Sequence, residues 1–207
     1  MLIPDTYYHI YNHANGDDNL FREEKNYPFF LNKYHQHITP IADTVAWCLM
    51  PNHFHLLIKI KNEDALLQAF PTLKTLPKFK TLEEFTIEKN ISNLLSKQFS
   101  NFYSSYTQSF NKVYKRRGSL FLKNFKRKEI TTDEYLQALI LYIHLNSVKH
   151  GFVSHYNNWA WASYNEFPEQ QTLLFHYLFN TKENYEKQHL YRQEYFQEYL
   201  QLEADLT

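Results

Sequence analysis

Two short apolar runs separated by a turn constrain the fold more than any other feature of the chain. Residues 44–50 (TVAWCLM) and 53–60 (HFHLLIKI) are each long enough for one strand, and the Pro-Asn pair between them is typical of turns. The sequence therefore predicts an antiparallel β-hairpin. Because side chains alternate along a strand, the second run places its apolar side chains on one face, the predicted core face, and His53 and His55 on the other, less apolar face.

The rest of the chain alternates between strand-like and helix-like segments and contains no internal repeat. Residues 6–13 are rich in β-forming residues and end at a turn signal, ANGDD. Apolar residues recur at helical spacing from 91 to 113, and residues 131–149 carry helix start and stop signals. The other expected elements are a helix at 22–38, a loop or irregular insertion at 61–90, a strand or extended arm at 119–125 and a polar helix at about 182–203.

Composition indicates a soluble protein of a reducing compartment. The 207 residues are enough for one domain with a real core. Because 18% of them are aromatic, we expect aromatic side chains to make much of the core packing or of the contact with a ligand. The single cysteine, Cys48, excludes an internal disulfide. No apolar stretch approaches the ~18 residues of a membrane span, and the N-terminus lacks the features of a signal peptide. We therefore expect a cytoplasmic protein with no membrane partner.

Charge is segregated along a chain whose net charge is zero. Residues 112–128 carry eight basic side chains and no acidic one, whereas residues 163–207 carry eight acidic and three basic side chains. Aromatic residues interleave with the basic ones, a composition suited to following a phosphate backbone while stacking bases. A charged, solvated loop is the alternative interpretation. The candidate DNA-contacting residues of this segment are Lys112, Lys115, Arg116, Arg117, Lys123, Lys126, Arg127 and Lys128.

The His-x-His pattern permits a metal site. His53 and His55 have Cα atoms about 7 Å apart on one strand face, close enough for both imidazoles to reach one ion. Spacing alone does not decide the matter, since such a pair is more often two hydrogen-bonded surface histidines. Tyr142 and Asn146, at i and i+4 of the helix predicted at 131–149, offer a nucleophile and an amide oxygen ligand on one face. A core tyrosine and a helix-capping asparagine are the alternative.

Four further residues have competing interpretations. Tyr106 is the rival nucleophile, but it falls on the apolar stripe of its helix, which favours a core role. Lys149 shares a helix face with Tyr142 and is a candidate phosphate contact, although a solvated lysine that complements the helix dipole is at least as common. We interpret His9 and His144 as structural residues or DNA contacts.

Four stretches of the sequence, MPNHFHLLI, SYTQSFNKVYKRRGSLF, YIHLNSVKHGF and WAWASY, occur in an order known from one family. Together they resemble the REP-associated tyrosine transposases, which are single-tyrosine members of the HUH superfamily (His, hydrophobic, His), over roughly residues 6–167. The resemblance implies an α+β fold of ferredoxin or RRM type, with helices packed on a central antiparallel sheet. Residues 1–167 would form the transposase domain, with 61–90 as an insertion, and 168–207 an acidic helical extension.

The resemblance also implies an activity. Such proteins are metal-dependent endonucleases and strand transferases that act on single-stranded DNA at hairpin-bearing ends, and we expect a monomer or a homodimer. By motif, His53, His55 and Asn146 would be the metal ligands, for Mg²⁺ or Mn²⁺. Tyr142 would be the nucleophile and would form a 5′-phosphotyrosine with a free 3′-hydroxyl.

The expected chemistry requires help for the tyrosine. Since an unperturbed tyrosine has a pKa of about 10, little phenolate exists at neutral pH, and a divalent ion that draws charge from the phosphate is part of the expected mechanism.

The chain has Ser147 where relatives commonly have proline, and Lys123-Asn124 where they often have Gly-Arg. Neither departure removes a catalytic group. A catalytically silent, domesticated nucleic-acid-binding module and a metallohydrolase of small substrates are the other two hypotheses.

Overall fold

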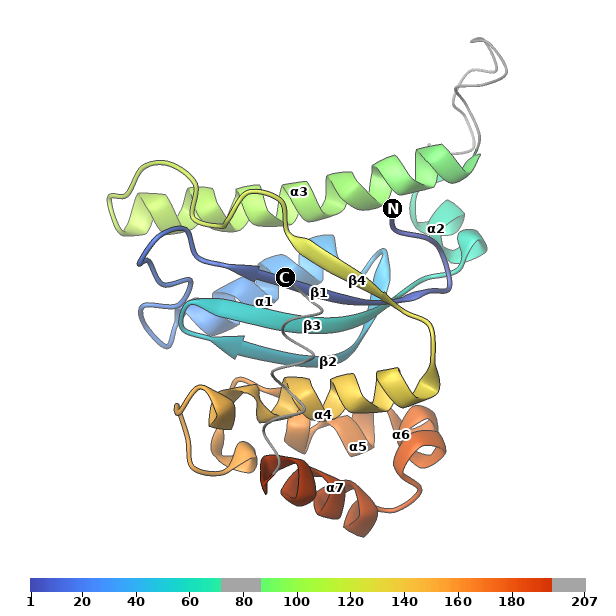
Figure 1. Cartoon of the computed structure of the whole chain (residues 1–207). Helices are drawn as coiled ribbons and strands as arrows, with labels where there is room; N and C mark the ends of the chain where they lie inside the picture. The colour runs from blue at the N-terminus through green and yellow to red at the C-terminus, as the bar shows by residue number, and fades with distance from the viewer. Residues whose placement is uncertain (72–86, 195–207) are drawn as a thin grey trace.

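The computed structural model describes residues 1–71 and 87–194, and an antiparallel sheet forms the centre of this part of the molecule (Figure 1). Its strands lie in the order β2-β3-β1-β4. Their bounds are β1 (Tyr7–His13), β2 (Ala42–Met50), β3 (His53–Ile60) and β4 (Lys126–Ile130). β2 and β3 pair antiparallel across the Pro-Asn turn, so the predicted hairpin is confirmed.

Helices cover both faces of the sheet, which confirms the α+β class (Figure 1). α1 and α3 lie on one face, α4 lies on the other, and α5 to α7 lie outside α4. No helix within the described ranges is long and apolar enough to cross a membrane. The bounds are α1 (Asn26–His37), α2 (Glu63–Ala69), α3 (Ile87–Val113), α4 (Asp133–Lys149), α5 (Phe167–Gln170), α6 (Thr172–Phe179) and α7 (Lys182–Glu194), with 3-10 turns η2 (Tyr156–Asn158) and η3 (Ser163–Asn165).

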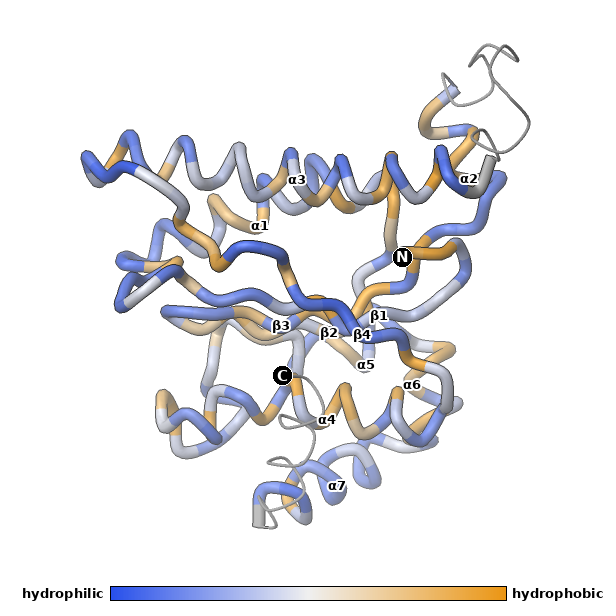
Figure 2. Tube along the Cα trace, turned by 45° about the horizontal axis from the view of Figure 1, so that its top comes forward, coloured by the Kyte–Doolittle hydropathy of each residue, from blue (hydrophilic) through white to orange (hydrophobic). Residues whose placement is uncertain are grey.

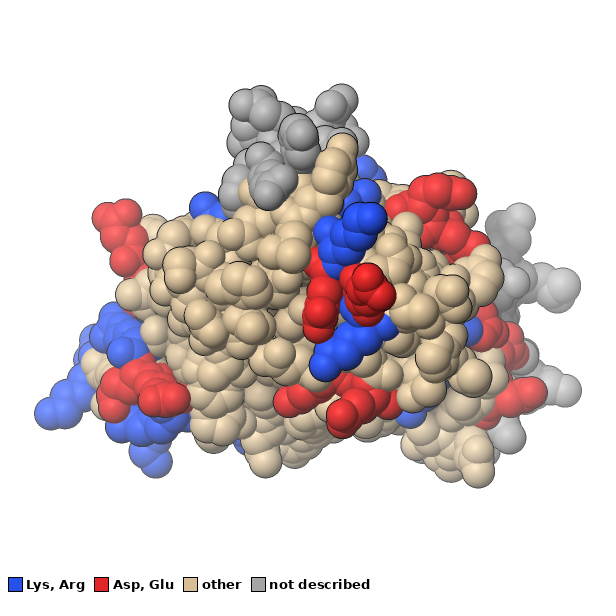
Figure 3. Space-filling view, turned by 90° about the horizontal axis from the view of Figure 1, so that it is seen from below, with Lys and Arg blue, Asp and Glu red and all other residues tan. Residues whose placement is uncertain are grey.

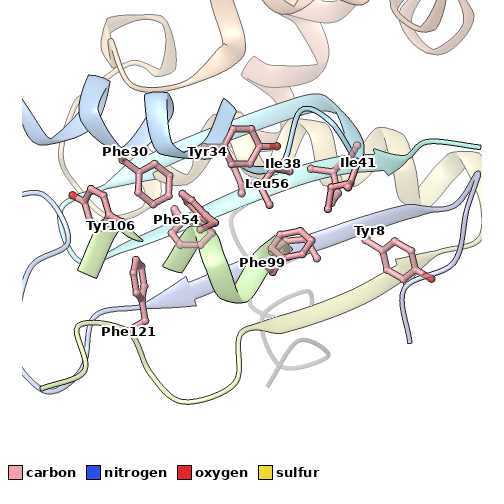
Figure 4. Close-up of a cluster of buried hydrophobic side chains, with 14 of the residues drawn as sticks. Tyr8, Phe30, Tyr34, Ile38, Ile41, Phe54, Leu56, Phe99, Tyr106 and Phe121 are labelled. Carbon is pink, nitrogen blue, oxygen red and sulfur yellow. The ribbon is translucent and has the colours of Figure 1, made fainter. Parts of the chain in front are cut away.

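The core between the sheet and the α1–α3 layer is built largely from aromatic rings (Figure 4). The ring of Phe30 in α1 lies 5.3 Å from that of Phe54 in β3 and 5.0 Å from that of Phe102 in α3, measured between centroids. Such tilted and edge-to-face pairs are favourable beyond the area they bury. The face of β3 that the alternation pattern assigns to the core is therefore a core face.

The opposite face of the sheet is interior as well, which alternation alone did not predict. Leu139 and Leu141 lie on nearly opposite sides of α4 and are both fully buried, because this helix is enclosed between the sheet and the C-terminal helices. Phe179 of α6 belongs to the same core. His53 and His55, expected on a less apolar face, are only 3% and 4% exposed.

Local sequence signals fix both ends of α4. The side chain of Thr132 accepts a hydrogen bond from the backbone N–H of Tyr135, as an N-cap does. At the other end, Gly151 adopts a left-handed φ of +73°, and the N–H of Phe152 donates to the carbonyl of Ser147 at 2.9 Å. This pattern is a Schellman C-cap, which uses glycine because a side chain disfavours that φ.

Of three other expected elements, one differs from the structure, one matches one of its two alternatives and one is described only in part. α2 lies inside the segment 61–90, where we expected a loop, and residues 72–86 fall outside the described part. Residues 119–125 run as an extended arm with one bridge, between Phe121 and Ala14, and the strand β4 begins after it. Figure 2 shows that β4 is strongly hydrophilic, so the apolar pattern sought in the sequence does not mark it. The helix expected at 182–203 is present as far as residue 194, beyond which nothing is described.

Candidate active site

The register between β1 and β3 gathers several rings on the sheet face that α4 covers. Tyr11 lies opposite His55 and His13 lies opposite His53, and directly paired residues of antiparallel strands project to the same side. The rings of His13 and His53 stack, with centroids 4.5 Å apart. His9, two residues before Tyr11, projects to the same face and stacks on His55. The histidine pair is thus part of a larger cluster of rings.

The helix α4 places Tyr142 directly over this cluster. Its ring centroid lies 5.3 Å from that of His55 and 6.2 Å from that of His9. One turn later, Asn146 donates its side-chain N–H to the carbonyl of Tyr142 at 2.9 Å. The Nζ of Lys149 lies 5.5 Å from the centre of the Tyr142 ring. The structure therefore places the predicted nucleophile beside His55, whose ring lies 5.4 Å from that of His53, and places Asn146 one helical turn from that nucleophile.

The tautomers of the two histidines suit metal binding. His53 Nδ1 lies 2.7 Å from Asn52 Oδ1, and because an amide oxygen only accepts, Nδ1 carries the proton and Nε2 keeps its lone pair. His55 Nδ1 lies 2.9 Å from His9 Nε2. When His55 donates in this pair, its own Nε2 is also left with a lone pair. Asn52, expected to be only a turn residue, therefore also orients His53.

Burial keeps the imidazoles of His9, His53 and His55 neutral. Burial lowers the pKa of His53 to about 2, and the nearby charges of His13, His150 and Lys149 act in the same direction. Burial, with the charge of Lys128, lowers the pKa of His9 to about 3, and burial first of all holds the pKa of His55 well below its ordinary value. Neutral rings are the form that ligates metal ions.

Asn146 offers the third donor. It is fully buried, and its Oδ1 has no hydrogen-bond partner among the described residues. A buried acceptor left without a partner costs roughly 1–3 kcal/mol, so such atoms in native proteins call for a ligand or another explanation. No group of three or more His, Cys, Asp or Glu side chains in the described residues is arranged to hold a metal ion. A metal at this site would therefore depend on the amide as well as on the histidine pair.

The mouth of the site lies at its His13–His150 end. Tyr142 is 1% exposed, whereas His13 is partly exposed and His150, just after α4, is exposed. The ring of His150 lies 4.7 Å from that of His53. We did not single out His13 or His150 from the sequence. His13 was accessible to sequence reasoning, because alternation along the strand predicted at 6–13 places it on one face with His9 and Tyr11.

The rival nucleophile lies on the other side of the sheet. Tyr106 of α3 is fully buried in the α1–α3 core, and its hydroxyl donates to the backbone carbonyl of Leu20 at 2.6 Å. It is labelled in Figure 4 among the core rings. Of the two candidate nucleophiles, Tyr142 and not Tyr106 lies next to the histidines.

Strand β4 divides the predicted basic residues between the two sheet faces. Lys128 lies opposite His9 and Lys126 lies opposite Tyr11, so both lysines project to the face that carries the site. The intervening Arg127 projects to the other face, where its guanidinium lies 5.6 Å from the Phe125 ring. Two of the predicted DNA-contacting residues thus border the site along the sheet edge.

The other basic residues lie farther from the site or already have partners. Arg116 donates to Asp18, to the side chain of Asn111 and to the backbone carbonyls of Gly118 and Ser119, so its guanidinium joins two loops. The remaining side chains are exposed, and their contacts with DNA stay predictions; they are Lys112, Lys115, Arg117 and Lys123.

The C-terminal helices support α4 from behind through a buried polar network. His144 Nδ1 lies 3.2 Å from His189 Nε2 and 3.0 Å from the Tyr185 hydroxyl, both on α7. Its Nε2 lies 3.0 Å from the Ser163 hydroxyl. His144, expected as a structural residue or a DNA contact, is therefore structural. The division of the chain at residue 167 stays a prediction.

The outer surface on the α7 side has no continuous basic patch in the view of Figure 3. Its Lys and Arg side chains stand in small groups beside Asp and Glu, and most of the surface is neutral.

Comparison with known proteins places these observations in context. No family model matches the chain. A Haemophilus influenzae protein, provisionally named a REP-associated tyrosine transposase, is 27% identical over 125 residues. The match covers 59% of this chain, and the chain spans 58% of that relative's length.

A solved structure shares the fold. It is described as a REP-associated tyrosine transposase bound to a REP hairpin, and it superposes with a TM-score of 0.53, covering 80% of this chain and 79% of that one. Its sequence identity is 14%, so the likeness is one of fold. In the sequence of its matched part and in its fold, the chain is similar to the REP-associated tyrosine transposases.

Proposed function

We propose that the protein is a metal-dependent endonuclease and strand transferase that cleaves single-stranded DNA near hairpins through a covalent tyrosine intermediate. The observation that carries the proposal is the placement of Tyr142 on α4 against His55 of β3, with the unpartnered amide oxygen of Asn146 one helical turn away. A structural role alone would leave this buried amide oxygen without a partner.

The residues present fit a divalent ion. His53 and His55 would bind through their Nε2 atoms and Asn146 through Oδ1, a donor set compatible with Mg²⁺ or Mn²⁺, with nitrogen ligands favouring Mn²⁺ in affinity. Such an ion, when bound, would withdraw negative charge from the scissile phosphate. Three neutral ligands leave its charge uncompensated, so metal and DNA phosphate should bind cooperatively.

The covalent step exchanges one phosphodiester for another. The Tyr142 oxygen forms a bond to phosphorus and loses its proton, the bond from phosphorus to the 3′ oxygen breaks, and that oxygen gains a proton. The bond energy is conserved in a 5′-phosphotyrosine, which permits rejoining. Within the chain, the Schellman cap of α4 fixes the helix that carries the tyrosine, and Lys149 places positive charge near the ring on which negative charge develops.

The proposed partner is a single strand with a hairpin nearby. A nucleophile fixed on a buried helix needs a strand that bends toward it, and an unpaired strand avoids the unpairing cost of a few kcal/mol. The printed description of the structural relative, a transposase bound to a REP hairpin, supports a hairpin as the recognition element. Lys126 and Lys128, on the edge strand beside the site, are placed to contact the backbone.

The test is covalent adduct formation. Wild-type protein incubated with single-stranded hairpin DNAs and Mn²⁺ or Mg²⁺ should give a protein–DNA adduct on denaturing electrophoresis. Tyr142→Phe and His55→Ala should give none, while far-UV circular dichroism shows that both remain folded. Tyr106→Phe is the matched control and should retain the adduct, because that hydroxyl lies in the opposite core.

The outcomes separate the hypotheses. An adduct that persists in Tyr142→Phe would overturn the assignment of the nucleophile. Hairpin binding without any adduct, equal in wild type and Tyr142→Phe, would identify a catalytically silent binding module. Hydrolysis of small phosphoesters that needs the histidines but not Tyr142 would identify a metallohydrolase.

A further inference from the structure

A groove of about 490 Å³ opens beside the mouth of the site. We call it the aromatic groove; its lining includes Phe21, Tyr27, Pro51, Val153, Trp159 and Trp161. Pro51 belongs to the turn that leads directly into His53, so the groove begins where the site opens. Its volume falls within the range of small-ligand pockets, and its walls are mostly flat rings.

A series of rings connects the site to this groove. From His53 the steps run to His150 at 4.7 Å, from His150 to Phe152 at 6.5 Å, and from Phe152 to Trp159 at 5.6 Å in a stacked arrangement. Tyr27 then stacks on Trp161 at 4.6 Å within the groove. Because the ring of Tyr27 also lies 6.4 Å from that of Trp159, the rings form a continuous series from the site into the groove.

The rings of the groove are held rigidly. The indole N–H of Trp159 donates to the backbone carbonyl of Leu49 at 3.0 Å, and the N–H of Leu49 donates to the carbonyl of Trp161 at 2.8 Å. The tryptophan segment is thereby fastened along the edge of β2. Phe152 follows the left-handed Gly151 that ends α4, and its side chain remains 40% exposed. Phe21 and Tyr27 are buried, whereas Trp159 and Trp161 are partly exposed, so the surface open to a flat ligand is that of the two tryptophans and Phe152. A rigid surface of this kind binds flat ligands at low entropic cost.

Charge decides which part of a nucleotide the groove accepts. Glu23, Glu24 and Arg22 line it. The Glu23 carboxylate is already hydrogen-bonded by Tyr114 and paired with Lys25, and the Arg22 guanidinium is paired with Asp18. Acidic side chains repel phosphates but accept hydrogen bonds from the amino groups of bases. The groove therefore suits unpaired bases, with their backbone outside it.

We propose that the aromatic groove stacks the unpaired bases of the DNA strand that continues from the scissile phosphate. The inference rests on the proposed function, since it names the path of that substrate beyond the site. The groove would hold the strand in register while the tyrosine reacts, and its contacts would tolerate many sequences because every base has a flat face.

The test compares flanks with and without bases in a Tyr142→Phe background, which binds without cleaving. The probes are a stable DNA hairpin with a short oligothymidylate flank, placed on the 5′ or the 3′ side, and the same molecules with abasic residues in the flank. Phosphate charge is equal in both, so the difference isolates the bases. We expect one of the two base-bearing flanks to bind about tenfold more tightly than its abasic counterpart.

Phe152→Ala should remove that advantage and leave the abasic probe unaffected. Phe152 does not itself line the groove but stacks on its Trp159. Phe29→Ala is the matched control: Phe29 is 38% exposed, close to the 40% of Phe152, but its ring lies beside Tyr106, so its removal should change neither affinity. Equal binding of base-bearing and abasic flanks on both sides, or an unchanged advantage in Phe152→Ala, would overturn the proposal.

Two different measurements test the groove proposal and the proposed function, so either proposal can fail without the other. Adduct formation by the wild-type protein reports on the function, whatever the flank. A wild type that forms the adduct but shows no base-dependent affinity would keep the function and discard the groove. A base-dependent affinity lost in Phe152→Ala, without any adduct, would keep the groove as a strand-binding surface and discard the cleavage chemistry.

Discussion

The sequence marks His9 only as a structural residue or a DNA contact, but the structure places it against His55. It is fully buried, stacks on His55, and its Nε2 lies 2.9 Å from the His55 Nδ1. A partner on the second nitrogen of a ligating imidazole fixes both the tautomer and the orientation of the ring. We therefore regard His9 as a positioning residue for the proposed metal site.

Replacing His9 should weaken metal binding without unfolding the protein. His9→Phe keeps a ring but removes the hydrogen-bonding partner of His55, so Mn²⁺ affinity should fall by about 10–100-fold. His9→Gln offers a carbonyl acceptor in the same region and should recover part of the loss. Calorimetric Mn²⁺ titration measures both, with circular dichroism as the check on folding. Wild-type Mn²⁺ affinity in His9→Phe would show that the contact is only packing.

At the scale of elements, apolar runs and turn residues predicted the hairpin, β-forming residues and a turn signal predicted the first strand, helical spacing predicted α3, and start and stop signals predicted α4. These patterns missed β4, whose sequence KRKEI becomes a strand only by pairing with β1. They also missed α2, although Asn62 caps the helix by accepting from the Ala65 N–H at 2.8 Å. For the site, the motif supplied the main residues, but the strand register that adds His9 and His13 needs the three-dimensional pairing.

The alternation of side chains along β4 leads to a prediction about DNA binding, because two of its lysines face the site and its arginine faces away. Lys126→Gln together with Lys128→Gln should weaken binding of single-stranded DNA to all sequences. The log-log salt dependence should become shallower by about 1.4, taking ~0.7 for each lost phosphate contact. Fluorescence anisotropy with labelled DNA at several salt concentrations measures both quantities. Arg127→Gln, on the same strand but facing away, is the control. Identical slopes in the wild type and the two-lysine variant would remove this edge from the DNA path.

At the scale of the whole molecule, buried neutral histidines tie stability to pH. Burial lowers the pKa of His9 and of His189 to about 3 and that of His53 to about 2, while His55 and His144 are lowered well below their ordinary value. In the unfolded chain these rings take up protons below a pH of about 6.5, but in the folded protein they do so only far lower. Protons therefore favour the unfolded state.

The free energy of unfolding should thus be highest above a pH of about 6.5 and fall as the pH drops below it. Each such histidine contributes up to about 1.4 kcal/mol per pH unit. Urea unfolding in the presence of a chelator, at neutral pH and at about pH 5, measures the slope. His189→Gln should lower stability at neutral pH but flatten the slope, whereas His176→Gln, at an exposed position, should not. Equal stability at both pH values in the wild type would contradict the prediction.

The outer edge of β4 has a consequence for self-association. Among the described strands, β4 pairs only with β1, so its other side is a sheet edge of the kind that can join sheets from separate molecules. Two copies meeting there would bring lysines against lysines, and this repulsion disfavours a shared sheet. A homodimer, if one forms, would have to use another surface. Neutralising these lysines would also lower the barrier to concentration-dependent aggregation, so the same charges would both attract DNA and keep the molecules apart.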